Sequence, residues 1–182
     1  MSSTLGEDMH RLVTAYPTDS ERDRAVRSDF LTFFADAEGP VRRDAGASHA
    51  TASAFVFDPT LDRTLLVFHR KGRFWVQPGG HLEDDDASIR DAALRELREE
   101  TGLHPAGIED ADAYDLDHHA LSTAFGRCRS HLDVGIAMIA SDEAAVTVSD
   151  ESEDVRWWPV AGLPRDVPAG FTERLQRLRE RL

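Results

Sequence analysis

The sequence GGHLEDDDASIRDAALRELREETGL at residues 79–103 decides the fold, because its second half has the period of an amphipathic helix. At about 100° per residue, four small or apolar side chains share one helix face: Ile89, Ala92, Ala93 and Leu97. Ser88 is placed to cap the first turn, with Asp91 three residues later as a variant capping box. Gly102 follows the last turn, where glycine commonly ends a helix. The pattern predicts a helix over residues 87–101 with its apolar face on a sheet.

Three carboxylates lie on or beside the buried face of this predicted helix. Glu96 and Glu100 project onto the same face as the apolar residues, and Glu99 lies at its edge. Carboxylates four residues apart repel each other, and burial adds to the cost unless they are paired. Arg95 is the well-placed cation nearby, and a hard divalent cation such as magnesium resolves the remaining repulsion. The alternative is a solvated acidic helix end, which the helix dipole disfavours.

The composition indicates one globular domain of ordinary size. The chain has 182 residues, of which 41% are hydrophobic, so it can bury a core. It carries 34 acidic residues against 21 lysines and arginines, a formal charge of −13, which disfavours duplex nucleic acid as a partner. A small anionic substrate is compatible with this charge, because a bound divalent cation reverses the local sign.

The sequence also predicts a cytoplasmic protein with no membrane partner. Its only cysteine is Cys128, so no intrachain disulfide can form. No apolar run reaches the roughly 18 residues of a membrane span. The first residues lack the basic and apolar segments of a signal peptide.

Residues 1–45 are predicted to form a helical extension ahead of the main domain, residues 46–182. Apolar residues recur at steps of three and four on both sides of Pro17, which separates two helices. Asp19 or Ser20 can cap the second helix. We expect these helices to pack within the molecule; a homodimer contact or a lid are the alternatives.

Six strands and a C-terminal helix are predicted around the acidic helix. Strand patterns occupy residues 49–58, 63–69, 74–76, 112–117, 133–140 and 155–160. Phe171, Leu175, Leu178 and Leu182 mark an amphipathic helix at the C-terminus. Strands mixed with two long helices predict an α/β fold whose sheet is covered on both faces.

Residues 95–103 resemble the Nudix box, which reads Gly, five residues, Glu, seven residues, then Arg-Glu-apolar-any-Glu-Glu-any-Gly-apolar. Every specified position of its second half is matched, and Gly79-Gly80 match its start. Further stretches resemble one bacterial branch of that family: HATAS at 49–53, WVQPGGH at 75–81 and ESEDVRW at 151–157. The resemblance implies a Nudix-type α/β/α sandwich with a mixed central sheet.

The sequence departs from the Nudix box in the loop before the helix. From Gly80 to Arg95 is 95 − 80 = 15 steps, where the motif has 14, so one residue is inserted at 83–86. The first Glu of the motif becomes Asp86, or Asp85 if the gap is placed later. In the Nudix family, this first Glu of the motif pairs with the arginine of the box. Here the shorter aspartate side chain, in a longer loop, can still reach Arg95.

The resemblance implies a magnesium-dependent hydrolase, with manganese as an alternative ion, that cleaves a nucleoside diphosphate derivative. It assigns the metal to Glu96, Glu99, Glu100 and the carbonyl of Gly80. It also implies a catalytic set: Glu99, Arg95 and a general base before the last strand, with Glu151 as the first choice. For Glu151 the alternative is a solvated acidic loop. Arg95 is expected to orient the glutamates rather than contact the substrate.

Substrate contacts are expected from three further side chains, His81, His131 and Trp75. His81 directly follows the box glycines, and His131 lies at a strand end. For each histidine the alternative is an ordinary structural residue, and for Trp75 it is core packing. Cys128 lies between two arginines in a predicted polar loop without an evident partner base, so no thiol nucleophile is expected.

Two rival functions remain open from the sequence. One is a non-catalytic module that senses a nucleotide, but such modules often lose box carboxylates, and this chain keeps Glu96, Glu99 and Glu100. The other is an isomerase of isoprenoid diphosphates on a Nudix-like fold. That chemistry needs a cysteine in the pocket, and the context of Cys128 is poor for it.

Overall fold

The computed structural model describes residues 5–35, 41, 46–104, 108–121, 127–150 and 152–182. The chain divides into two compact units. The first contains Met1–Ala52, Gly80–Ala92 and Leu116–Val134, and the second contains Ser53–Gly79, Ala93–Asp115 and Gly135–Leu182. Several elements begin in one unit and continue into the other, so each unit is described by its own contacts.

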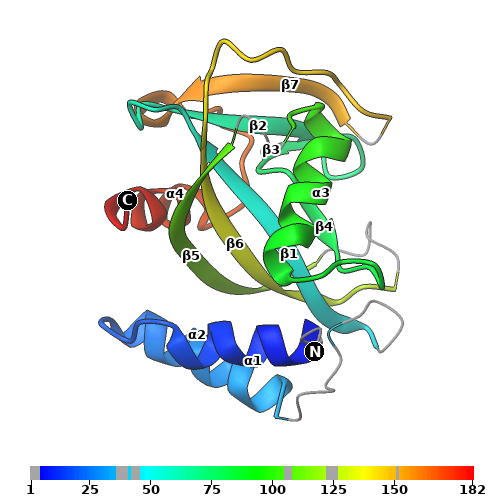
Figure 1. Ribbon diagram of the computed structural model, residues 1–182, viewed down its shortest axis with the longest axis vertical. Helices are drawn as coiled ribbons and strands as arrows, with labels where there is room; N and C mark the ends of the chain where they lie inside the picture. Colours follow the sequence, from blue (N-terminus) through cyan, green and yellow to red (C-terminus); the bar gives the residue numbers. More distant parts are fainter. Residues whose placement is uncertain (1–4, 36–40, 42–45, 105–107, 122–126, 151) are drawn as a thin grey trace. The chain divides into compact units, whose positions relative to one another are not determined.

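Two N-terminal helices lie side by side in the first unit, α1 (Leu5–Ala15) and α2 (Glu21–Phe33) (Figure 1). Ser20 caps α2 by accepting a hydrogen bond from the Asp23 N–H at 3.0 Å, which confirms one of the two predicted caps. The helices bury apolar side chains at the expected steps; they are Leu5, Met9, Val13, Tyr16, Val26, Phe30 and Phe34. Phe33 at the end of α2 is only partly buried, whereas Phe34, the residue after the helix, is 4% exposed.

An α1 side chain also meets the start of the box helix, α3 (Ile89–Thr101). The Asp8 carboxylate is buried and accepts a hydrogen bond from the Ile89 N–H at 2.9 Å. The first N–H groups of a helix have no partner within the helix, and a carboxylate there is favourable for the helix dipole. The N-terminal helices therefore help to fix the first turn of α3.

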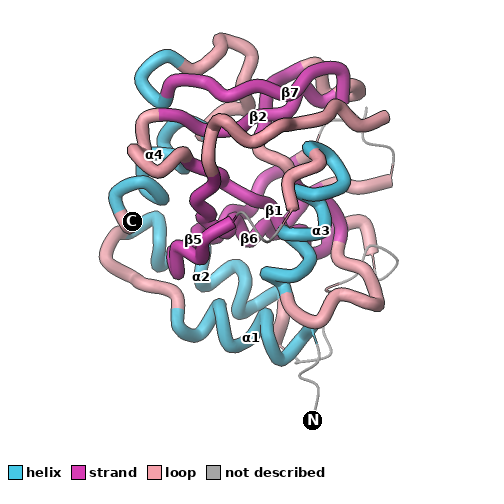
Figure 2. Tube along the Cα trace, turned by 45° about the horizontal axis from the view of Figure 1, so that its top comes forward, coloured by secondary structure: helices cyan, strands magenta, loops and turns pink. Residues whose placement is uncertain are grey.

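A seven-stranded sheet forms from β1 (Ser48–Phe57), β2 (Arg63–His69), β3 (Phe74–Val76), β4 (Gly79–His81), β5 (Ile108–Ala120), β6 (Ser130–Ala140) and β7 (Ser152–Pro159). Its strand order is β3-β2-β1-β6-β5, with β4 paired to β1 and β7 paired to β2. Figure 2 shows β7 beside β2, and the two strands are antiparallel. The six predicted strands are confirmed, while β4 is additional and β5 is longer than the predicted 112–117.

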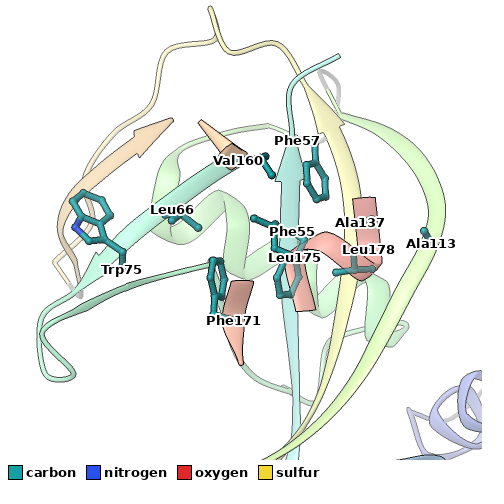
Figure 3. Packing of buried hydrophobic residues seen from close by; sticks show 10 residues of the cluster. All are labelled: Phe55, Phe57, Leu66, Trp75, Ala113, Ala137, Val160, Phe171, Leu175 and Leu178. Carbon is teal, nitrogen blue, oxygen red and sulfur yellow. The ribbon is translucent and has the colours of Figure 1, made fainter. Parts of the chain in front are cut away.

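The core of the second unit forms between strands and the C-terminal helix α4 (Phe171–Glu180) (Figure 3). Phe55 of β1 stacks on Phe171 with ring centroids 5.9 Å apart, and Leu175 and Leu178 follow along the same helix face. A buried ion pair reinforces this packing, because Arg174 Nε donates to Asp115 Oδ2 at 3.0 Å. The helix predicted from Phe171, Leu175 and Leu178 is thereby confirmed.

Both ends of α3 have the features predicted from the sequence. Ser88 Oγ accepts from the Asp91 N–H at 3.0 Å and donates to the Asp91 carboxylate at 2.8 Å, which is the variant capping box. Gly102 has φ +71° after the last turn, and a Cβ there would lie 2.4 Å from Thr147 Oγ1. The helix begins at Ile89, two residues later than predicted.

Candidate functional site

The C-terminal half of α3 gathers four charged side chains, the acidic helix site: Arg95, Glu96, Glu99 and Glu100. Arg95 Nη1 donates to Glu96 Oε1 at 2.9 Å and to Glu99 Oε2 at 3.2 Å. The exposed fractions of the side chains are 13% for Arg95, 15% for Glu96 and 51% for Glu99. Arg95 therefore joins one largely buried and one exposed carboxylate, as a positioning group would.

Glu100 is the most enclosed carboxylate of the acidic helix site, with 7% of the residue exposed. Its Oε2 accepts a hydrogen bond from the Gly79 N–H at 2.9 Å. Gly79 is the first residue of β4 and is followed directly by Gly80, whose carbonyl is a predicted metal ligand. The predicted orientation of Glu100 toward the packed side of α3 is confirmed.

The carboxylates of the acidic helix site fit a hard divalent cation. Three glutamates lie within five residues of one helix, and two of them are largely buried. Arg95 provides one positive charge for this cluster. Oxygen donors of this kind are the ligands that magnesium takes in proteins. The metal roles of Gly80, Glu96, Glu99 and Glu100 stay predictions that this arrangement supports.

The structure does not test the predicted role of Glu151 and gives Trp75 a different environment from the one expected of a substrate contact. Glu151, the expected general base, lies outside the described residues. Trp75 is 9% exposed and packs edge-on against Phe68 and Trp158, with ring centroids 5.3 Å and 5.2 Å away. This packing favours the core alternative for Trp75, and its contact with substrate stays a prediction.

Four side chains in the first unit form the His/Cys cluster: His49, His81, Cys128 and His131. One ligand atom from each lies within 4.8 Å of all the others. The expectation that Cys128 sits in a polar loop without a partner is wrong. Cys128 is 7% exposed and its Sγ lies 4.0 Å from His81 Nε2. His81 and His131 lie together in this cluster. Their predicted roles in binding substrate stay predictions.

The imidazole of His131 stays neutral in this setting. The pKa of His131 is lowered to about 3, mainly by burial and also by the neighbouring His119, His81 and His49, while Asp133 opposes the shift. A neutral imidazole keeps a nitrogen lone pair available, which is the form that ligates metals. The cluster is therefore chemically different from the acidic helix site, whose donors are carboxylate oxygens.

The sequence alone did not reveal this grouping because its members come from three separated segments. His49 and His131 are the second residues of β1 and β6, His81 ends β4, and Cys128 precedes β6. The only local signal is the spacing of Cys128 and His131, a Cys-x-x-His, which is weak by itself. Strand pairing brings the remaining histidines to it.

Comparison with known sequences decides the family. The model of the NUDIX domain matches residues 47–180, which include the acidic helix site and most of the sheet. The chain belongs to the NUDIX domain family. It is also similar to the Uncharacterized Nudix hydrolase YvcI of Bacillus subtilis (strain 168), with 44% identity over 45 residues. That match spans 25% of this chain and 28% of the length of its relative.

Solved Nudix structures share the fold, an α/β arrangement of a mixed sheet with flanking helices. The C. elegans Ap4A hydrolase in a binary complex is 15% identical with a TM-score of 0.61, covering 70% of this chain and 93% of that one. The NUDIX domain of Shewanella oneidensis NrtR complexed with ADP ribose is 22% identical with a TM-score of 0.56, covering 72% and 86%. No α-helix among the described residues is both long and apolar enough to cross a bilayer.

Proposed function

We propose that this chain is a magnesium-dependent hydrolase that cleaves the diphosphate linkage of a nucleoside diphosphate derivative or a related nucleotide. The observation that carries the proposal is the acidic helix site in a chain of the NUDIX domain family. Glu96 and Glu100 are largely buried there, and Arg95 donates to Glu96. The names of two structural neighbours, an Ap4A hydrolase and a domain complexed with ADP ribose, support nucleotides as the substrate class.

In this proposal Glu96 and Glu100 hold the metal ion with the carbonyl of Gly80, and Glu99 completes the cluster. A bound magnesium ion would polarise a phosphoryl oxygen, lower the pKa of a water and neutralise charge on the leaving phosphate. The Gly79 N–H fixes one Glu100 oxygen at 2.9 Å, which limits the rotation of this carboxylate.

Arg95 acts through the glutamates in this scheme. Its guanidinium donates to Glu96 and Glu99 and holds them in one arrangement on the helix. Glu151 would accept the proton of the attacking water, a role proposed from its position six residues before Trp157. The rival function, a nucleotide-sensing module, requires binding of the nucleotide without turnover.

A substrate panel tests the proposal. The purified chain is incubated with nucleoside diphosphate derivatives and nucleoside triphosphates, with magnesium, with manganese and with neither, and phosphate-containing products are quantified. We expect metal-dependent turnover of at least one compound, which Glu100→Gln abolishes. Glu180→Gln is the matched control, because Glu180 is exposed at the end of α4.

The outcomes separate the two functions. Turnover that Glu100→Gln leaves unchanged contradicts the metal role of this carboxylate. Tight nucleotide binding without any product, measured by calorimetry across the same panel, supports the sensing module and overturns the hydrolase.

A further inference from the structure

The His/Cys cluster has the donor set of a transition-metal site. It presents three imidazoles and one thiol, and their ligand atoms lie within 4.8 Å of one another. His49 is fully buried, Cys128 is 7% exposed, and His81 and His131 are partly buried. The proposed magnesium ion takes oxygen ligands, so the proposed hydrolysis does not call for a sulfur donor at this place.

Backbone hydrogen bonds hold the segments of the cluster together. The Arg129 N–H donates to the Ala47 carbonyl at 2.7 Å, which fixes the residue after Cys128 close to the start of β1. The Leu121 N–H donates to the Arg129 carbonyl at 2.8 Å. In the sheet, β1 pairs with β4, and β6 is the neighbour of β1 (Figure 1). The donors are therefore positioned by main-chain structure that does not depend on a ligand.

Two of the imidazoles have a buried nitrogen without a hydrogen-bond partner. His49 Nδ1 lies 3.1 Å from the Gly46 carbonyl, so Nδ1 carries the proton and donates, and Nε2 keeps its lone pair. The buried Nε2 atoms of His49 and His131 have no partner. Unpartnered polar atoms in the interior are unfavourable and rare in native proteins. A metal ion would give these two nitrogens a partner, and it could also take His81 and the sulfur of Cys128 as ligands.

We propose that the His/Cys cluster binds one zinc ion with His49, His81, Cys128 and His131 as its four ligands. Zinc takes cysteine sulfur and histidine nitrogen in tetrahedral sites, where neighbouring ligand atoms lie about 3.3 to 3.8 Å apart. The cluster needs only a small contraction to reach that spacing. Magnesium does not fit it, because that ion selects oxygen donors.

Four protein ligands close the coordination shell, so the site is structural rather than catalytic. Binding replaces the proton of the Cys128 thiol, and the histidines enter in their neutral form. The ion would join the start of β1, the end of β4 and the segment leading into β6. The zinc proposal does not rest on the proposed hydrolase activity, whose metal ligands are other residues. In the zinc proposal His81 and His131 bind the ion in place of the substrate contacts predicted for them.

Metal analysis of the full-length chain tests the proposal. The protein is purified without a histidine tag, supplied with zinc, dialysed against metal-free buffer and analysed by plasma mass spectrometry. We expect stoichiometric zinc in the wild type. Cys128→Ser should weaken zinc affinity by at least about 100-fold, since even groups that only orient metal ligands contribute about 10- to 100-fold. His104→Asn is the control, because His104 is exposed after α3.

A spectroscopic arm tests the ligands without altering the chain. Cobalt substitution should give the intense visible bands of a tetrahedral site and a thiolate-to-cobalt charge-transfer band in the near ultraviolet, which Cys128→Ser removes. His49→Asn should lose the visible bands as well, and circular dichroism reports whether that buried variant folds. A wild-type chain without the charge-transfer band, or equal zinc affinity in Cys128→Ser and wild type, overturns the proposal.

Glu100→Gln distinguishes this proposal from the hydrolase. The variant should keep full zinc content, because its carboxylate belongs to the acidic helix site. Zinc that disappears with Glu100→Gln and persists in Cys128→Ser would show that the ion binds the glutamates, and the zinc proposal would be wrong.

Discussion

The acidic helix site and the His/Cys cluster differ in donor chemistry, in burial and in how the chain assembles them. The first uses carboxylates from one helical segment, residues 95–100, with Arg95 already donating to two of them. The second uses imidazoles and a thiol from separate segments, with buried nitrogens that have no hydrogen-bond partner. Our two proposals assign a different ion to each, a hard divalent ion for hydrolysis at the acidic helix site and a structural zinc ion at the His/Cys cluster.

The largest effect is expected at Glu100. Glu100→Gln removes the negative charge of a buried ligand and replaces one of its two oxygens by an amide nitrogen. Turnover should fall at least about 100-fold, since groups that merely orient ligands contribute about 10- to 100-fold. Initial rates against magnesium concentration measure the loss. The control Glu180→Gln, at an exposed position, should retain the wild-type rate. Equal losses in both variants would contradict a specific role of Glu100 in turnover.

Arg95→Gln should lower turnover by about 10- to 100-fold, because it removes the group that orients Glu96 and Glu99. The apparent magnesium activation constant should rise, and Arg95→Lys should rescue part of the activity by restoring the charge without the planar guanidinium. Arg98→Gln is the matched control on the exposed side of α3. An unchanged activation constant in Arg95→Gln would contradict the positioning role.

Asp8→Ala should lower the free energy of unfolding by about 1 to 3 kcal/mol, because it leaves the buried Ile89 N–H without its acceptor. Chemical denaturation measures the loss. Zinc content and the magnesium activation constant should not change, which separates a stability defect from damage to either cluster. Glu7→Gln, an exposed neighbour in α1, should be close to neutral; a loss as large as that of Asp8→Ala would rule out the specific contact.

The smallest effect is expected at Ser88. Ser88→Ala removes the acceptor of the Asp91 N–H and should cost about 1 kcal/mol of stability. Ser88→Thr keeps the hydroxyl and should restore most of it. Thermal unfolding of both variants checks this order, and a Ser88→Thr variant less stable than Ser88→Ala would contradict the cap.

The acidic helix site was predictable from the sequence because its information is local. Residues three and four apart meet on a helix, so the burial of Ile89, Leu97 and Glu100 followed from spacing alone. Caps and a terminal glycine mark the helix ends by the same local chemistry. The fold class followed too, because strand patterns mixed with two long helices along residues 49–182 predict a sheet covered by helices.

Other features escaped because their cause is not local. β4 has the sequence Gly-Gly-His, which carries no strand signal, and exists because β1 pairs with it. β5 is long although acidic residues interrupt its apolar pattern. The His/Cys cluster depends on strand pairing across 82 residues, from His49 to His131, which no spacing rule reveals.

A metal-selectivity measurement tests the central claim most directly. Manganese, as a paramagnetic substitute for magnesium, is titrated into the zinc-loaded wild type, Glu100→Gln and Cys128→Ser, and free manganese is read by electron paramagnetic resonance. The account predicts that Glu100→Gln loses manganese binding and keeps its zinc, whereas Cys128→Ser keeps manganese binding and loses its zinc. Wild-type manganese affinity in Glu100→Gln would contradict the assignment of the hard-metal site to the glutamates of α3.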